Sequence, residues 1–250
     1  MADLTVGTVG YVMQRGRTLD QTPPERVDAR TERWREHRRK VRADFVTAAF
    51  RALDKHGPEV SMGDIAREAG AAKPKLYRHF ADKTDLYNAI VDRVRDLLWE
   101  RVIEGIDLTG DSTGELIRRG AVEYVRVVTE HPQVFRFMLH SHFTQRADES
   151  ERALHTARQS ARRAADLVAG LDESLDVDSV ELVNYSIFGA VASATDWWLG
   201  ANRRREQTMS TDSFVAYLTE IICALATANA RLSGIVFDLE LPLHSAFRSA

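Results

Sequence analysis

The sequence predicts an all-α protein, in which a small three-helix head is joined by one long helix to a larger helical body. Apolar residues recur at helical spacing through most of the chain. No run alternates apolar and polar residues as a half-buried strand would. The 14 glycines and 6 prolines rarely interrupt the periodic segments.

The first 30 residues show little periodicity. They contain Gly7, Gly10, Gly16 and two successive prolines, so we expect residues 1–30 to form a flexible arm. From Arg26 to Arg42 the chain carries eight Lys and Arg against three acidic residues. This stretch is either the solvated start of a helix or a basic surface for a partner.

The first helix of the head has an apolar stripe that ends before Gly57 and Pro58, which stop the helix. The stripe consists of Val41, Phe45, Ala48, Ala49, Ala52 and Leu53. We expect these residues to form the small core of a head that spans residues 31–82.

Two short helices joined by a tight turn follow. Ser61 and Asp64 have the spacing of a capping box at the start of the first. Gly70 follows it, where a helix favours a left-handed residue. Pro74 suits the first turn of the second helix, because its missing N–H would have no partner there.

The second short helix divides into an apolar and a cationic side. Leu76 and Phe80 are four residues apart and can pack onto the preceding helix. The side chains of Lys73, Lys75, Tyr77 and His79 project elsewhere, as a helix that lies in the major groove of DNA requires. A helical hairpin with a solvated basic side is the alternative.

Residues 69–83, AGAAKPKLYRHFADK, resemble the recognition-helix signature of the TetR family of bacterial transcription regulators, and residues 60–66 resemble its preceding helix. The similarity spans residues from about 40 to 90. Ala72 and Lys75 depart from the common pattern, which has a hydroxyl and a small residue there. Ala72 could meet a thymine methyl, and Lys75 a guanine or a phosphate. Counting also phosphate or minor-groove contacts from the basic stretch, the expected DNA contacts are Arg38, Arg39, Ser61, Ala72, Lys73, Lys75, Tyr77, His79 and Lys83.

A long helix over 83–104 leaves the head and enters the body, with Asp82 as its cap. Its apolar stripe is Leu86, Ile90, Val94, Leu97, Leu98 and Val102. We predict further helices over 113–130, 132–143, 148–169, 178–200 and 210–231. The ligand-binding and dimerisation domain would span residues 83–231, and residues 232–250 would be a C-terminal extension of mixed pattern.

The resemblance implies a homodimer whose last two helices pair with their copies, although core helices of a monomer would show similar stripes. The expected interface residues are Ile187, Val191, Phe214, Leu218, Ile221 and Leu225. Two copies of one short reading helix would fit a palindromic DNA operator.

The resemblance also implies a small-molecule effector. The aromatic and apolar middle helices favour a hydrophobic ligand, and a similarity to actinobacterial members linked to lipid and alkane metabolism suggests a fatty acid or acyl derivative. Asn184, His140 or His142 could meet its polar end. The expected pocket residues are Leu98, Tyr124, Val128, Phe135, Met138, Phe143, Asn184, Phe188 and Trp197.

Charge separates the two parts of the chain. Residues 26–83 hold 15 Lys and Arg against 9 acids, a net charge of +6, whereas residues 84–250 hold 17 against 25, a net of −8. A basic head on an acidic body fits DNA contact at one end.

Several classes of site and location are not expected. No motif for catalysis, a cofactor or a metal appears, and His131, His140, His142 and His155 lack metal-ligand spacing. Cys223 is the single cysteine and is expected to be a buried, inert thiol. No run approaches the roughly 20 apolar residues of a membrane span, and we expect a cytoplasmic protein.

Together these patterns predict a ligand-responsive repressor that a hydrophobic small molecule releases from a palindromic operator. An activator role is possible within the same fold. The alternative from another class is an all-helical lipid-binding protein or enzyme with a vestigial DNA-binding head.

Overall fold

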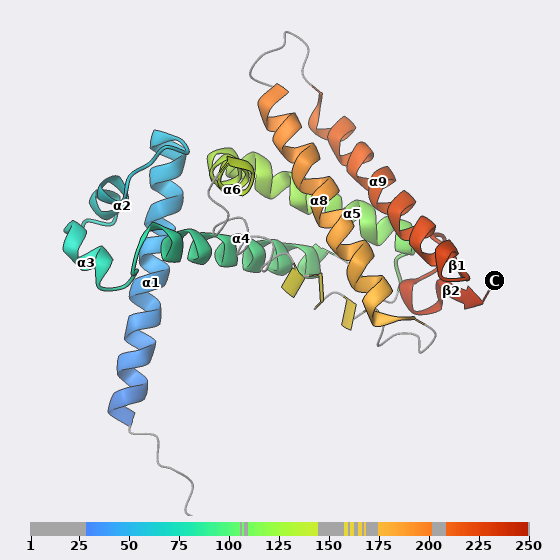
Figure 1. Cartoon of the computed structure of the whole chain (residues 1–250), viewed down its shortest axis with the longest axis horizontal. Helices are drawn as coiled ribbons and strands as arrows, with labels where there is room; N and C mark the ends of the chain where they lie inside the picture. The colour runs from blue at the N-terminus through green and yellow to red at the C-terminus, as the bar shows by residue number, and fades with distance from the viewer. Residues whose placement is uncertain are drawn as a thin grey trace, which may run out of the picture.

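The computed structural model describes residues 29–105, 107, 110–144, 158–159, 161–162, 165–166, 168, 175–201 and 209–249. Helices dominate these residues, which confirms the all-α prediction (Figure 1). The helices are α1 (Ala29–His56), α2 (Met62–Glu68), α3 (Lys73–Tyr77), α4 (Lys83–Gly105), α5 (Thr113–Glu130), α6 (Pro132–Thr144), α8 (Val177–Ala201) and α9 (Thr211–Leu232).

The body helices begin and end close to the bounds predicted from their apolar stripes. The helices predicted over 113–130, 178–200 and 210–231 correspond to α5, α8 and α9 within one residue at each end. The segment predicted over 148–169 lies mostly outside the described residues, and those described within it are helical. At the N-terminus, α1 already begins at Ala29, so the basic stretch is helical from there on.

In the head, α2 packs against the C-terminal half of α1, and α3 packs against α2 (Figure 1). Gly57 and Gly70 have positive φ angles of 83° and 62°, which lets the chain turn sharply after α1 and α2. Leu76 and Phe80 are fully buried and close the core of the head, as their spacing predicts.

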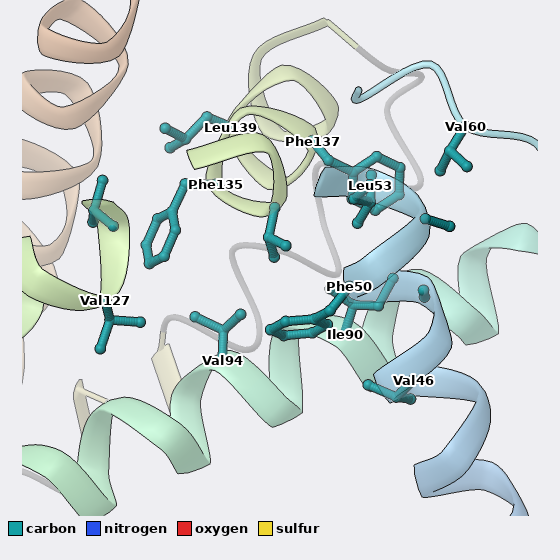
Figure 2. Close-up of a cluster of buried hydrophobic side chains, with 14 of the residues drawn as sticks. Val46, Phe50, Leu53, Val60, Ile90, Val94, Val127, Phe135, Phe137 and Leu139 are labelled. Atoms are coloured by element: carbon teal, nitrogen blue, oxygen red, sulfur yellow. The ribbon is translucent and has the colours of Figure 1, made fainter. Parts of the chain in front are cut away.

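One hydrophobic core runs from the head into the body (Figure 2). Leu53 of α1 lies beside Phe137 of α6, while Val94 of α4 lies between Phe50 of α1 and Val127 of α5. Helix α6 therefore packs directly on α1. The body is coupled to the head by this contact as well as by α4.

The C-terminal extension is an ordered hairpin, which the sequence did not predict. Strands β1 (Ile235–Phe237) and β2 (Phe247–Ser249) pair antiparallel around the short 3₁₀ helix η1 (Leu243–Ser245). The hairpin covers the start of α5, where the N–H groups of Thr113 and Gly114 donate to the carbonyls of Leu241 and Leu239, both at 2.8 Å. These bonds satisfy amides that a helix start otherwise leaves without partners.

Among the described residues, α9 is one helix whose length and composition would allow it to cross a membrane, with a mean hydropathy of 1.4. Only 17% of that apolar window is buried within the protomer. Such a helix is weak evidence for a membrane span, because a helix that packs on a partner subunit has the same composition.

Candidate nucleic-acid interface

Helix α2 begins with the predicted capping box. The Ser61 hydroxyl oxygen accepts from the Asp64 N–H at 3.2 Å, and an Asp64 carboxylate oxygen accepts from the Ser61 N–H at 3.1 Å. The Ser61 hydroxyl also donates to that carboxylate at 2.6 Å, which lowers the pKa of Asp64. Ser61 was expected at the DNA, but its hydroxyl is already engaged in the cap.

Helix α3 presents a cationic surface. Leu76 is buried beneath it, whereas Lys73, Lys75 and Tyr77 are exposed. The Lys73 ammonium lies 5.9 Å from the centre of the Tyr77 ring. Arg78, which the sequence reasoning passed over, is exposed beside them. This surface has the charge and the size of a helix that contacts DNA.

The N-terminus of α3 lacks a side-chain cap. Ala72 occupies the N-cap position with φ −74° and ψ 143°, and Pro74 lies in the first turn. A hydroxyl at this position would accept a backbone N–H of the first turn. Ala72 is exposed, so its methyl group remains available to a ligand.

His79, an expected DNA contact, is only partly accessible. Its side chain is half-buried, and its ring lies 5.8 Å from that of Phe45. Burial lowers the pKa of His79, and the positive charges of Arg38 and Arg42 lower it further. The imidazole of His79 packs against α1 beside Phe45.

Arg42 links the end of α3 to the start of α4, and no sequence motif indicated this. Its guanidinium donates to the His79 carbonyl oxygen and to both carboxylate oxygens of Asp85, at 2.8 and 3.3 Å. It also lies 4.2 Å from the centre of the Phe80 ring. The Asp85 carboxylate accepts the Ala81 N–H at 3.0 Å. The hydrogen bond from Arg42 is the main cause of the lowered pKa of Asp85.

The remaining expected DNA contacts lie on either side of α3. Arg38 and Arg39 are exposed on α1. Lys83 is exposed at the first position of α4, but its ammonium lies 5.9 Å from the centre of the Phe137 ring of α6. In this conformation Lys83 is directed towards the body.

Several expected pocket residues meet between α4, α5, α6 and α8. Val128 and Phe135 are buried in the core, and Leu98 and Met138 pack against it. The Tyr124 hydroxyl lies 2.7 Å from that of Thr195, and burial raises the pKa of Tyr124 to about 12. The amide nitrogen of Asn184 is buried without a hydrogen-bond partner in the described part of the chain.

Within the protomer, two expected pocket residues are exposed and two expected interface residues are buried. Phe188 and Trp197, expected in the pocket, are 42% and 50% exposed on α8. Phe214 and Leu218, expected at the dimer interface, are 1% exposed, and Phe214 stacks on Trp198 with ring centres 4.5 Å apart. The physical reason is that the apolar stripe of α9 packs on its own protomer. Ile187, Val191, Ile221 and Leu225 are half-buried. For Phe143 no side-chain environment is described.

The remaining titratable groups show no ligand set. In the described residues, no group of three or more His, Cys, Asp or Glu could hold a metal ion. His155 and the side chains of His140 and His142 lie outside the described part. Cys223 is half-buried, and burial raises the pKa of its thiol.

Comparison with known proteins assigns both parts of the chain. The family described as "Bacterial regulatory proteins, tetR family" matches residues 45–90, and "Tetracyclin repressor-like, C-terminal domain" matches residues 111–237. A helix-turn-helix regulator of Mycobacterium tuberculosis that has not been characterized is 31% identical over 215 residues, which are 83% of this chain and 88% of that protein. The transcriptional activator FasR of Mycolicibacterium smegmatis is 24% identical over 174 residues, 69% of this chain and 78% of FasR.

A solved structure shares the fold. The crystal structure of a TetR-family regulator from Streptomyces coelicolor superposes with a TM-score of 0.58 at 24% identity, over 79% of this chain and 83% of that one. The capped α2 and the cationic α3 lie within the residues that match the N-terminal family model, and most of the helical body lies within those that match the C-terminal one. The chain belongs to the TetR family of bacterial transcriptional regulators.

Proposed function

We propose that this regulator is a homodimeric repressor that binds a palindromic operator and is released by a hydrophobic small molecule. The exposed cationic surface of α3, held on a buried Leu76, is the observation that carries the DNA-binding part. Regulators of this family bind DNA operators, form dimers and bind small-molecule ligands, and they are not enzymes. The alternative of an enzyme or lipid carrier with a vestigial head is therefore set aside.

Base reading is assigned to α3. Lys73, Lys75 and Tyr77 would lie in the major groove, with Ala72 near a thymine methyl and Lys75 at a guanine or phosphate. Arg38 and Arg39 would hold the phosphates beside it. A rotation of the Lys83 side chain away from Phe137 would let its ammonium reach a phosphate at the start of α4.

Self-association is assigned to the surface shared by α8 and α9. The exposed large apolar side chains of these two helices are Leu182, Phe188, Trp197, Tyr217 and Leu232. A hollow of about 530 Å³ opens on this surface between Trp197 and Tyr217. An apolar surface of this kind is favourable only when a second copy covers it. Ile187, Val191, Ile221 and Leu225 would border this contact, while Phe214 and Leu218 support it from inside.

The effector site is assigned to the interior of the body, where the Tyr124 and Thr195 hydroxyls meet and Asn184 lies 11 residues earlier on α8, about 16 Å along the helix. The Thr195 hydroxyl donates to the Val191 carbonyl at 2.8 Å, so Tyr124 must be the donor in the bond between the two hydroxyls. The unpartnered amide of Asn184 is a donor for a carboxylate or carbonyl oxygen. A fatty acid or acyl derivative has this combination of one polar end and an apolar chain.

The signal would reach the head by two routes. Helix α4 runs from the pocket region to Asp85, which Arg42 ties to the end of α3. Helix α6 packs on α1, where His131 lies 3.5 Å from Asp54 and its ring 5.3 Å from that of Phe50. A ligand acts only if it binds one arrangement of these helices more tightly than the other.

Salt dependence of DNA binding tests the proposal. We would select a duplex from a random library with the wild-type protein and measure its affinity by fluorescence anisotropy. Between about 50 and 200 mM salt we expect affinity to fall by at least ~10³. Lys75→Ala should relax selectivity at one operator position, whereas Lys83→Ala should weaken all duplexes about equally. Lys55→Ala, at an exposed lysine at the far end of α1, is the matched control. If no duplex is selected, or if affinity does not depend on salt, the DNA-binding assignment fails.

The effector assignment has its own test. Native mass spectrometry of the purified protein should show a co-purified lipid on the dimer, and added long-chain fatty acid should release the labelled duplex. Asn184→Leu should weaken that release without changing DNA affinity in the absence of lipid. Release that is unaffected by Asn184→Leu would contradict the assignment of this amide.

An activator is the second candidate, because the relative FasR is a transcriptional activator. A reporter gene placed behind the selected operator separates the two roles. Deletion of the regulator raises expression if it represses and lowers expression if it activates.

A further inference from the structure

One side of α1 packs in the core of the head near its middle and extends, towards the N-terminus, beyond α3. Trp34, Arg38, Arg42 and Phe45 are spaced i, i+4, i+8 and i+11, so they lie on the same side of the helix. The last two pack against the end of α3: the Phe45 ring contacts that of His79, and Arg42 donates to the His79 carbonyl. At Arg42 and Phe45, this side of α1 therefore faces the end of α3.

Towards the N-terminus, the same side passes the end of α3 and is uncovered by any described residue. We call residues 32–40 the α1 extension. Figure 1 shows that this part of α1 projects beyond the other helices of the head. Trp34 is 60% exposed there, and the Arg38 guanidinium lies 5.6 Å from the centre of its ring.

The α1 extension is strongly cationic. It holds five Lys and Arg against two Glu, a net charge of +3 over nine residues. Within it, Arg35 lies 3.6 Å from Glu32, and both side chains of this pair are more than half exposed. Exposed positive charge beside an exposed aromatic ring is typical of nucleic-acid surfaces.

This charge belongs to the same surface as α3. Arg38 lies one turn before Arg42, whose guanidinium donates to the His79 carbonyl, and burial followed by the charges of Arg38, Arg42 and Lys75 lowers the pKa of His79. A polyanion bound along α3 would thus meet the α1 extension next.

We propose that the α1 extension is a second DNA-binding element, which contacts the duplex that flanks the site read by α3. Arg35, Arg38 and Arg39 bind phosphates, and the Trp34 ring packs on the sugar edge. Nine helical residues span about 13 Å, which corresponds to roughly four base pairs at 3.4 Å each. The inference rests on the proposed DNA-binding function and assigns it a longer footprint.

The test compares two duplexes with the full chain. One carries the selected operator with flanks of about one helical turn, and the other is trimmed to the operator alone. The variant is the triple substitution R35A, R38A and R39A, which leaves Arg42 in place. The control removes three exposed arginines of the body, R93A, R126A and R231A, so that the net charge is the same.

On the flanked duplex, the triple variant should bind more weakly than the wild type. Its slope of log affinity against log salt should fall by about 0.9 for each phosphate that the variant no longer neutralises, with up to three at stake in each protomer. On the trimmed duplex the loss of affinity should be smaller, because the flanking phosphates are absent. Hydroxyl-radical footprints should shorten at both ends. The body control should match the wild type on both duplexes.

Trp34→Ala supplies an independent readout, with Trp99→Ala as its control because Trp99 is an exposed tryptophan of α4. We expect Trp34→Ala to weaken binding to the flanked duplex about three- to tenfold, and Trp99→Ala to leave it unchanged.

Equal weakening on the flanked and trimmed duplexes would overturn the proposal, since the side chains would then act through the head and not on flanking DNA. Unchanged binding to both would overturn it as well. Failure of the proposed function itself is distinguishable, because the wild type would then select no duplex and Lys75→Ala would have no effect. Far-UV circular dichroism of each variant verifies that α1 remains helical.

Discussion

Arg42→Gln should loosen the junction between α3 and α4 while leaving the rest of the head folded. The substitution keeps most of the aliphatic stem but removes the forked guanidinium. The substitution therefore removes the hydrogen bonds to both carboxylate oxygens of Asp85, the hydrogen bond to the His79 carbonyl and the contact with the Phe80 ring. Glutamine cannot replace a planar group that serves three partners at once.

The magnitude follows from these contacts. Hydrogen bonds to charged groups contribute about 1.5–3 kcal/mol each when buried. The Arg42 and Asp85 side chains are 32% and 34% exposed, and screening by water reduces that contribution by about half. The contact with the ring adds roughly 0.5–1 kcal/mol. We expect Arg42→Gln to cost about 2–3 kcal/mol, of which about 1–1.5 kcal/mol is coupling to Asp85.

A double-mutant cycle of Arg42→Gln and Asp85→Asn measures that coupling, from urea unfolding at a fixed protomer concentration. Because Arg42 lowers the pKa of Asp85, this stabilisation is present above the ordinary carboxyl pKa of 3.8 and is lost as the pH falls through the lowered value. Arg42→Gln should therefore remove part of the acid sensitivity. A coupling below about 0.3 kcal/mol, or unchanged acid sensitivity, would refute the reasoning.

Three further substitutions test the fold. Ala72→Thr should stabilise the protein by about 0.5–2 kcal/mol, because the threonine hydroxyl supplies the absent N-cap of α3. Ala72→Val, whose side chain has the shape of threonine but no hydroxyl, should not stabilise it, and equal melting temperatures for the two variants would contradict this prediction. Phe214→Ala should cost about 3–5 kcal/mol by opening a cavity beside Trp198, and a destabilisation below about 1 kcal/mol would show that Phe214 is not in the core. Tyr124→Phe should cost only about 1 kcal/mol, because the Thr195 hydroxyl keeps its bond to its own helix, and calorimetry that finds a much larger effect would reveal a further partner of Tyr124.

The local signals of the head were readable from the sequence because they depend on few residues close together. Ser61 and Asp64 form the predicted capping box, Gly70 has the predicted positive φ, and Pro74 lies in the first turn of α3. Each feature satisfies backbone groups of its own turn. The long apolar stripes placed the body helices for the same reason.

Features that depend on contacts distant in sequence were not predictable. The side of a residue on a helix does not say whether its own protomer or a partner covers it, so the sequence could not show that Phe214 is buried within its protomer and Trp197 half exposed. His79 has the spacing of a projecting side chain, yet Phe45, 34 residues earlier, packs on its ring. The strands of the hairpin hold three residues each, which is too short for an alternating pattern.

The cap that the hairpin places on α5 sets an order in which the chain can fold. Thr113 bonds to Leu241 across 128 residues, and α5 packs along α9. The body therefore cannot be completed on the ribosome until nearly the whole chain has emerged. The contacts of α1, α2 and α3 are far more local and close early. During synthesis, the DNA-binding head would fold before the body that binds the effector and a second copy. A newly made chain would therefore pass through a stage in which its head is folded and its body is not.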